Sequence, residues 1–249
     1  MKFSIVIITH NEAHRIENLL KHIPEVDEIL IVDSFSSDGT AELCEKYGAR
    51  IIRQEFLGFG KQKQAGVDAA KNDWIFSLDA DEIPDERCWN HIETLVQSEP
   101  TVKAWFMKRH LVFMDKAFRF GKESSDKQLR FFDRRHARWT DSAVHERVEY
   151  SGRKGILMGT VAHKSYDSLD NYFGKFNRYT SLAAEERNRR KKHSSVLSNV
   201  LSVPFNFFKF YFLQLNFLNG YPGYCWSVFS SIYSLVKHSK AAERKKSDN

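Results

Sequence analysis

The first hundred residues alternate between short β-branched runs and helical segments, and this alternation limits the fold more than any other feature of the chain. Apolar runs predict four strands, and a helical stretch follows each of the first three. Strands and helices that alternate at this length predict a parallel sheet with helices on both faces. We therefore expect a doubly wound, mostly parallel α/β sheet. Its predicted strands cover residues 3–9, 28–33, 49–54 and 74–78.

Polar clusters follow three of the predicted strands: THNE at residues 9–12, DSFSSD at residues 33–38 and DADE at residues 79–82. The carboxyl ends of parallel strands meet at one edge of a sheet, and ligands bind there in such folds. No glycine-rich loop follows the first strand, so the sequence contains neither a P-loop nor a dinucleotide-binding fingerprint. The three clusters are the candidate site.

Asp79 and Asp81 in DADE are the candidate metal ligands. Residues two apart in an extended chain point to the same side, so the two carboxylates would face together. Paired hard oxygen donors suit Mg²⁺ or Mn²⁺, which bind one or two carboxylates together with substrate phosphates. The alternative is an acidic loop in which Asp81 caps a helix that starts at Ile83 or Pro84. The position after an apolar strand favours the metal site.

The other two clusters also have a structural and a functional interpretation. Asn11 could cap the following helix, which is a common role for asparagine, or its side chain could contact a bound nucleotide. Asp33 could start a turn, as aspartate often does, or it could bind the base or ribose of a nucleoside. Both roles can hold together.

The C-terminal part of the chain is basic and aromatic. No Asp or Glu occurs between residues 187 and 242, and this favours an anionic partner. Residues 196–236 predict two helices joined by a turn at NGYPG. They could pack on the rest of the chain, but the density of aromatic residues favours a peripheral membrane segment on anionic headgroups. Polar residues within the stretch 200–218 argue against a spanning helix.

At this point the residues resemble a known family. SIVIITHNE, DSFSSDGT, GKQKQAG and SLDADE occur in the order typical of family 2 glycosyltransferases with the GT-A fold, and they cover residues 1 to about 90. Later segments, among them LRFFDRR and YFGKFNRYT, are most similar to the lipopolysaccharide-core β-1,4-glucosyltransferases of this family. Ser34 departs from the pattern, since many members carry a second Asp there.

The resemblance implies roles for individual residues. The nucleotide-sugar-binding residues that it implies are Thr9, Asn11, Glu12, Asp33, Lys61, Gln64 and Asp79. Asp81, with Asp79 as a possible second ligand, would bind Mg²⁺ or Mn²⁺ on the sugar diphosphate. His145 and His163 could complete the metal site, although a lone histidine is as often structural. Arg130 could face the diphosphate, since guanidinium pairs with phosphate; otherwise it is a surface charge at a strand edge.

An inverting transfer needs a base that deprotonates the acceptor hydroxyl. By analogy with the family, Glu146 is the candidate base and Asp141 the reserve. The alternative for Glu146 is a surface acid paired with Arg147 or Arg138. The Q-x-x-R-W motif of processive synthases is not met, because Arg135 stands where the Gln would be, and a single-sugar transfer is the better interpretation.

The predicted organisation follows from this resemblance. Residues 1–100 would be the nucleotide-sugar-binding half of a GT-A domain, 101–190 the acceptor-binding half, and 191–249 the membrane-associating helical segment. The expected reaction moves one sugar, glucose by family, from a UDP-sugar to a cell-envelope glycolipid such as lipopolysaccharide core. Scattered cysteines and an N-terminal apolar run too short for a signal peptide lead us to expect a cytoplasmic enzyme. The basic aromatic segment leads us to expect it to be peripheral on the inner face of the membrane.

Two other classes of protein remain open at this stage. A sugar-phosphate nucleotidyltransferase would share the sheet and the acidic metal ligands, but it normally carries a glycine-rich loop after the first strand. A nucleic-acid-binding or membrane-binding protein without catalysis could use the basic aromatic segment. No nucleic-acid-binding motif occurs in the sequence, so we expect no nucleic-acid partner.

Overall fold

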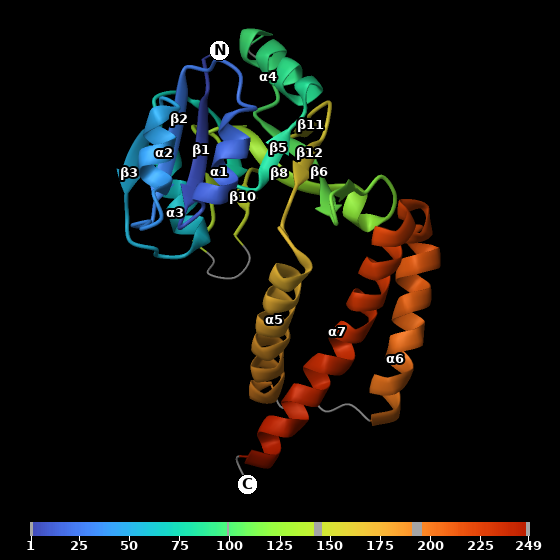
Figure 1. Cartoon of the computed structure of the whole chain (residues 1–249). Helices are drawn as coiled ribbons and strands as arrows, with labels where there is room; N and C mark the ends of the chain where they lie inside the picture. Colours follow the sequence, from blue (N-terminus) through green and yellow to red (C-terminus); the bar gives the residue numbers. More distant parts are fainter. Residues whose placement is uncertain (1, 99, 142–145, 191–195, 248–249) are drawn as a thin grey trace. The chain divides into compact units, whose positions relative to one another are not determined.

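A computed structural model (Figure 1) gives the fold of the chain, which divides into two compact units. The first unit contains Met1–Arg109 and Asp126–His163, and the second contains His110–Ser125 and Lys164–Asn249. The structure describes residues 2–98, 100–141, 146–190 and 196–247. These compact units are defined by contacts within the fold and not by function. The functional boundaries expected at residues 100 and 190 therefore stay predictions.

The first unit is built on one curled sheet with the strand order β3-β2-β1-β4-β8-β6-β12-β5. The first four of these strands are parallel to one another, whereas β8 is antiparallel to both β4 and β6. The strands are β1 (Ser4–Thr9), β2 (Glu28–Asp33), β3 (Arg50–Arg53), β4 (Trp74–Asp79), β5 (Glu82–Pro84), β6 (Ala104–Phe113), β8 (Asp126–Asp133) and β12 (Val161–His163). Strand β11 (Lys154–Ile156) also pairs with β6, and β9 (Arg138–Trp139) pairs with β10 (Val148–Glu149).

Helices cover both faces of this sheet. Successive side chains of β1 point to opposite faces of the sheet, and both faces are covered: Ile5 and Ile7 lie in one buried cluster and Val6 lies in the other. The first cluster includes side chains from α1 (Ala13–Leu20), α2 (Thr40–Lys46) and α4 (Glu86–Ser98), and the second includes Val67 of α3 (Phe59–Ala69). The predicted doubly wound α/β fold is confirmed.

Helix α3 lies unusually close to the sheet. A β-carbon at Gly66 would stand 2.4 Å from Val6 Cγ1 and 2.8 Å from Val32 Cγ2. Real β-carbons do not approach other atoms so closely, so only glycine fits between the helix and the strands. This close approach brings the preceding turn of α3 near the end of β4, where Lys63 contacts Asp79.

The second unit is helical. Its helices are α5 (Leu169–Arg189), α6 (Val196–Phe208) and α7 (Gly220–Ser247). A π-helical turn, η2 (Lys209–Leu213), and a 3₁₀ turn, η3 (Asn216–Asn219), connect α6 to α7. The end of β6 forms a hairpin with β7 (Lys116–Ala117) beside the 3₁₀ turn η1 (Lys122–Ser124). The predicted C-terminal helical segment is confirmed, and no helix within the described ranges is long and apolar enough to cross a membrane.

Candidate active site

The carboxyl ends of β2, β1 and β4 lie side by side and bring the three polar clusters together. Thr9 pairs with Asp33 across the sheet, and Ile8 pairs with Asp79 on the other side. Thr9 Oγ1 donates a hydrogen bond of 3.0 Å to Asp33 Oδ1. Both side chains are buried, at 4% and 1% exposure. The edge expected from the sequence therefore exists, and these two residues form its floor.

The loops after β1 and β2 are interlocked by hydrogen bonds. Asn11 Oδ1 accepts from the backbone N–H of Ser37 at 2.9 Å, and the backbone N–H of Asn11 donates to Ser36 Oγ at 2.9 Å. Asp38 Oδ2 accepts from the N–H of Ala13, the first residue of α1, at 3.1 Å. The helix-cap interpretation of Asn11 is wrong, because its oxygen is bound to the neighbouring loop and its backbone is left-handed, with φ of 56°.

Asp33 also performs the structural role foreseen for it. Its Oδ2 accepts from the backbone N–H of Ser36 at 2.9 Å, and its Oδ1 accepts from Ser36 Oγ at 2.5 Å. This is the turn geometry that aspartate commonly stabilises. Phe35, inside the turn, has a φ of 56° and is 57% exposed. Glu12, also named from the sequence, occupies the N-cap position of α1.

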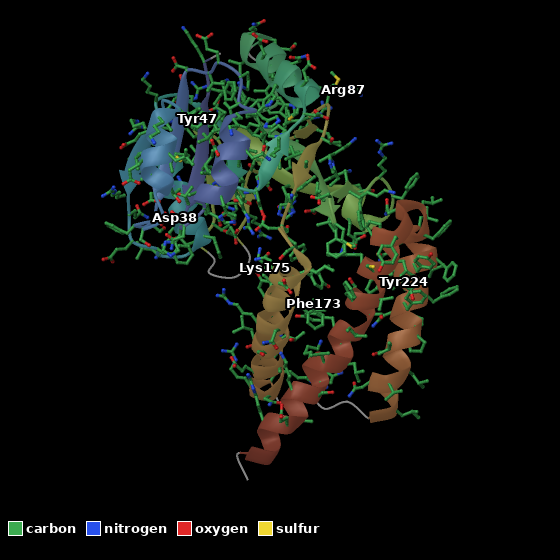
Figure 2. All side chains as sticks on the ribbon, in the orientation of Figure 1. Asp38, Tyr47, Arg87, Phe173, Lys175 and Tyr224 are labelled. Atoms are coloured by element: carbon green, nitrogen blue, oxygen red, sulfur yellow. The ribbon has the colours of Figure 1, made fainter. Side chains whose placement is uncertain are left out.

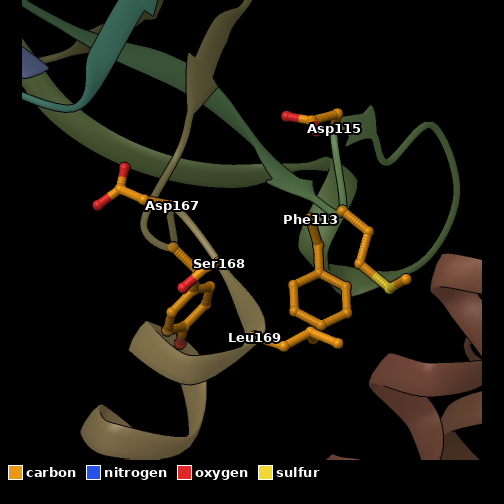
Figure 3. Close-up of a pocket in the computed structure, with 7 residues that line it drawn as sticks. Phe113, Asp115, Asp167, Ser168 and Leu169 are labelled. Carbon is orange, nitrogen blue, oxygen red and sulfur yellow. The ribbon is translucent and has the colours of Figure 1, made fainter.

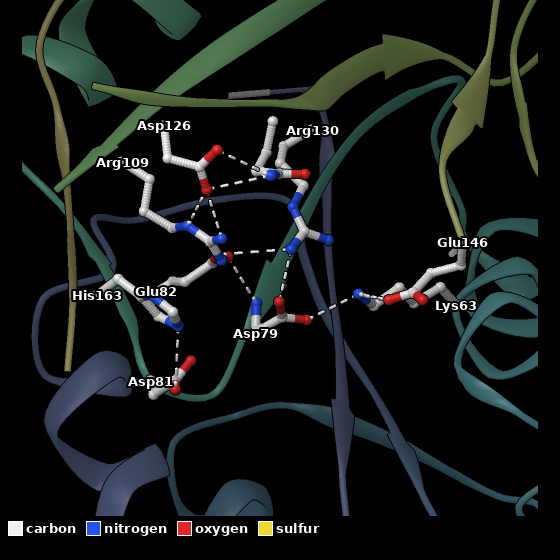
Figure 4. A network of polar contacts seen from close by, with 10 residues as sticks. Lys63, Asp79, Asp81, Glu82, Arg109, Asp126, Arg130, Glu146 and His163 are labelled. Carbon is white, nitrogen blue, oxygen red and sulfur yellow. Dashed lines mark hydrogen bonds and ion pairs between the residues drawn. The ribbon is translucent and has the colours of Figure 1, made fainter. Parts of the chain in front are cut away.

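Asp79 lies at the centre of a network of charged side chains (Figure 4). Arg130 Nη2 approaches Asp79 Oδ2 at 2.5 Å, and Lys63 Nζ approaches Asp79 Oδ1 at 3.0 Å. Glu82 is fully buried, accepts from the backbone N–H of Asp79 at 2.9 Å and pairs with Arg109 at 2.9 Å. Burial alone would raise the pKa of Asp79, but the charges of Arg130 and Lys63 outweigh it and hold that pKa well below its usual range. The two cations therefore favour the charged form of Asp79.

Arg130 is a buried residue of the sheet. It lies on β8 between β4 and β6, its exposure is 4%, and its guanidinium carbon is 5.4 Å from the centre of the Trp139 ring. The strand-edge interpretation of Arg130 is wrong, because β8 pairs on both sides. Burial lowers its pKa, but Asp79 and Glu82 more than compensate, so the pKa is raised and the charge is fixed.

Asp81 and His163 lie together, as the sequence analysis allowed. His163 Nε2 is 3.4 Å from Asp81 Oδ2, and the two side chains are 22% and 17% exposed respectively. Asp81 does not cap a helix, so that alternative is wrong: residues 82–84 form β5, and Asp85 Oδ1 accepts from the N–H of Cys88 at the start of α4.

The residues around Asp81 offer few donors to a metal ion. Within the part of the chain that the structure describes, no three His, Cys, Asp or Glu side chains converge on one point. His145 lies outside the described residues. One carboxylate and one imidazole, open to a diphosphate, fit an ion that takes the rest of its ligands from substrate and water. Asp79 fits less well, since two cations already occupy its oxygens.

Glu146, the candidate base, pairs with a lysine from helix α3. Its Oε1 is 3.4 Å from Lys63 Nζ, and its side chain remains 22% exposed. The alternative pairing with Arg147 is wrong, because Arg147 approaches Glu149 at 3.9 Å. Asp141, the reserve base, is exposed.

Helix α3 contributes a residue that the sequence analysis missed. Lys61 is exposed, and Gln64 accepts from the backbone N–H of Trp139 at 2.8 Å, so neither joins the charged network. Lys63 does, with a side chain only 4% exposed. A signal was present: Gly60 and Gly66 mark the face of α3 that packs closely, and Lys63 lies three residues from each.

A separate cavity of about 160 Å³ lies within the second unit (Figure 3). Residues 113–115 and 166–169 line it. Two of them, Asp115 and Asp167, are acids, and none is Lys or Arg. Lys164 Nζ pairs with Asp115 Oδ1 at 3.0 Å, so one of these two charges is balanced.

Comparisons with known proteins agree with the geometry of the first unit. The model of the family described as glycosyl transferase family 2 matches residues 4–157, more than half of the chain. An uncharacterized glycosyltransferase of Rickettsia felis is 28% identical over 97% of this chain and 90% of its own length. The lipopolysaccharide core biosynthesis glycosyltransferase LpsC of Rhizobium meliloti is 24% identical over 98% and 93%.

One solved structure shows the same fold along nearly the whole chain. S. aureus TarS 1-349, in complex with UDP-GlcNAc, aligns with a TM-score of 0.50 and 14% identity over 98% of this chain and 89% of its own. The nucleotidyltransferase and the non-enzymatic alternatives are set aside, because the family match covers the strand ends, the charged network and Glu146. The chain belongs to glycosyl transferase family 2.

Proposed function

We propose that the protein is an inverting, non-processive glycosyltransferase that moves one sugar, glucose, from a UDP-sugar to a lipid-linked glycan such as lipopolysaccharide core. The observation that carries the proposal is the network in which Lys63 joins Asp79, at the donor edge of the sheet, to Glu146. The similarity to LpsC over nearly the whole chain supports the acceptor class.

The donor nucleoside would bind on the floor formed by Thr9 and Asp33. Asp33 has oxygen lone pairs beyond those used in its turn, and Asn11 and Glu12 are held above it by the interlocked loops. A rigid floor of this kind positions the nucleotide without ordering the loops at the moment of binding. Asp79 would contact the ribose, while Lys61 and Gln64 line the approach from α3.

The diphosphate would lie toward Asp81, and Arg130 would contribute positive charge from beneath. Asp81 and His163 would hold Mg²⁺ or Mn²⁺ there, and the ion would supply positive charge to the departing diphosphate. The fixed guanidinium of Arg130 adds to the same field from a site with low exposure, where charges act over longer distances than in water.

Glu146 would take the proton from the acceptor hydroxyl as that oxygen attacks the anomeric carbon. The bond from the anomeric carbon to the diphosphate breaks on the opposite face, which inverts the configuration. Lys63 would orient the Glu146 carboxylate, because its ammonium contacts both this residue and Asp79. Lys63 would therefore hold both the catalytic base, Glu146, and the donor-binding carboxylate, Asp79, in position.

The test uses the purified chain, a panel of UDP-sugars, and an acceptor glycolipid with and without Mg²⁺ or Mn²⁺, with UDP release as the measurement. We expect turnover with one UDP-sugar and a metal. Glu146→Gln should lower kcat by about 10²–10⁴-fold, the contribution typical of a positioned base, whereas the exposed neighbour Glu149→Gln should not. Full transfer by Glu146→Gln, or unchanged metal-dependent turnover by Asp81→Ala, would contradict the respective assignment.

A lipid-linked acceptor would require the enzyme at the inner face of the cytoplasmic membrane, on an anionic surface. The basic, acid-free stretch between residues 187 and 242 supports this location.

A further inference from the structure

Helix α6 carries an uncovered apolar stripe. Leu197, Val200, Leu201, Phe205 and Phe208 are 68%, 53%, 57%, 67% and 52% exposed. Val200, Leu201, Phe205 and Phe208 follow Leu197 by three, four, eight and eleven residues, which places all five on one side of a helix. We call these five residues the α6 stripe. Monomeric soluble proteins rarely expose a continuous apolar surface of this kind, so it marks an interaction site.

The stripe is not needed to pack α6 on α7. That contact is made by another aromatic residue of α6: Phe207 meets Tyr224 of α7 with ring centres 5.9 Å apart, and Tyr211 of η2 stacks on Phe207 at 5.2 Å. Tyr224 is labelled in Figure 2. Because the helix pair is already held together on this side, the α6 stripe serves a partner outside the hairpin.

The two asparagines of the turn between α6 and α7 face inward. Asn219 is 1% exposed; its Oδ1 accepts from the N–H of Arg119 at 3.0 Å, and its Nδ2 donates to the carbonyl of Phe120 at 3.0 Å. Asn216 is fully buried, and its Nδ2 donates to the carbonyl of Phe210 at 3.1 Å. Leu213 and Tyr221 remain outside, at 66% and 69% exposure. Both asparagines therefore satisfy hydrogen bonds inside the protein, whereas Gln214 Oε1 is buried without a partner, and the outward side of the turn is left to apolar side chains.

The charged residues within and beside α6 and α7 in the sequence indicate the kind of partner. Residues 196–236 contain one cation, Lys209, which is exposed, and no acid. The flanking segments are basic: Arg187, Arg189 and Arg190 precede residues 196–236, Lys237 and Lys240 follow them, and no acid occurs between residues 187 and 242. Two copies of this surface would bring like charges together, whereas an anionic bilayer would accept the stripe and neutralise the cations.

We propose that the α6 stripe, with Leu213 and Tyr221 at the turn, lies in the interface of an anionic lipid bilayer, with α6 parallel to the membrane plane. This deepens the membrane attachment in the proposed function by assigning it to one surface. Lys209 extends its ammonium toward the headgroups, as lysines do beside an apolar surface.

The first experiment is flotation of the full chain with vesicles of phosphatidylcholine alone or with added phosphatidylglycerol. The wild type should float with the anionic vesicles, and Leu201→Gln/Phe205→Gln should lose about tenfold or more of the bound fraction. The matched control is Tyr179→Gln/Leu182→Gln on α5, which changes side chains of similar exposure, 54% and 49%, and should float like the wild type. Flotation of the stripe variant at the wild-type level would overturn the proposal.

A second measurement does not depend on how the stripe variant folds. The native cysteines are all buried, and burial raises the pKa of Cys44 and Cys88 to about 12, so a new surface thiol can be labelled selectively. A polarity-sensitive dye on Val200→Cys should shift to the blue when anionic vesicles are added, while the same dye on Leu182→Cys should not. No shift at residue 200 would reject the proposal, as would a wild-type dimer that the stripe substitutions dissociate without changing flotation.

These outcomes separate the two proposals. Flotation without sugar transfer to any acceptor would contradict the proposed function and support the proposed membrane surface. If the protein does not float but transfers sugar to an acceptor glycan without its lipid, the proposed membrane surface is contradicted and the proposed transferase activity is supported.

Discussion

Lys63 and Glu146 are 83 positions apart in the chain, and their charged groups meet at 3.4 Å. The lysine also approaches Asp79 at 3.0 Å and lies 4.8 Å from the centre of the Trp139 ring. With an exposure of 4%, its side chain has little freedom to take another position. A single ammonium therefore fixes two carboxylates for which we propose different roles, one in donor binding and one in catalysis.

Lys63→Met should impair catalysis more than donor binding. Glu146 loses its partner, whereas Asp79 keeps Arg130 at 2.5 Å. We expect kcat to fall about 10–100-fold, the scale on which a misplaced catalytic group costs activity, while KM for the UDP-sugar changes less. Steady-state kinetics check this, with Lys61→Met, an exposed change two residues away, as the control. Partial recovery in Lys63→Arg is expected, and an equal loss in both methionine variants would rule out the positioning role.

Arg130→Met should destabilise the first unit strongly. The substitution leaves Asp79 and the fully buried Glu82 with fewer cations, and breaking a buried pair in this way costs about 3–5 kcal/mol. Arg147→Met is the control, because Arg147 is 78% exposed and its pair with Glu149 is long, at 3.9 Å. Exposed pairs contribute about 0–1 kcal/mol. Urea denaturation measures both, and similar losses for the two variants would contradict the buried network.

Asp79→Asn should make stability less sensitive to acid. Burial would raise the pKa of Asp79, but Arg130 and Lys63 hold it below the unfolded value of about 3.9. Such a carboxyl stabilises the fold above that unfolded pKa, and the contribution disappears as the pH falls toward the folded pKa. The wild type should therefore lose more Tm than Asp79→Asn between about pH 5 and pH 2.5. Asp141→Asn, at an exposed position, should follow the wild type; parallel curves for all three proteins would exclude the predicted linkage.

Two glycine substitutions should have opposite effects on stability. Gly66→Ala places a β-carbon 2.4 Å from Val6 Cγ1, and such overpacking costs about 1–3 kcal/mol. Gly174→Ala lies in α5 with no atom within 4 Å of the new carbon, so it should stabilise by about 0.5–1 kcal/mol. Thermal unfolding distinguishes the two. A neutral Gly66→Ala would mean that α3 can move away from the sheet.

The sequence predicted the sheet and its functional edge well, because both depend on local periodicity and on the position of polar residues after apolar runs. β1, β2 and β4 lie within a residue or so of their expected bounds, and Thr9, Asp33 and Asp79 meet where expected. The pairing of strands that are far apart in the chain could not be predicted from local sequence patterns. The antiparallel insertion of β8 between β4 and β6 buries Arg130, and nothing local to LRFFDRR specifies that position.

Lys63 and Asn11 show why single residues are harder to place than strands. A lysine on a helix is usually solvated, and only the glycines on either side indicate that its face is closely packed. An asparagine before a helix is usually a cap. Here Asn11 instead accepts from Ser37 of the neighbouring loop, a contact 26 residues away that propensity does not encode.

The interlocked loops after β1 and β2 have a consequence for engineering and for evolution. Asp38 holds the start of α1, Asn11 holds Ser37, and the N–H of Glu12 donates to Thr40 Oγ1 at 3.0 Å. A transplant of either loop alone from another transferase would leave donors and acceptors of the remaining loop without their partners. Residues 9–13 and 33–40 therefore form one exchangeable cassette, and a new donor preference would have to be introduced, or inherited, through both loops at once.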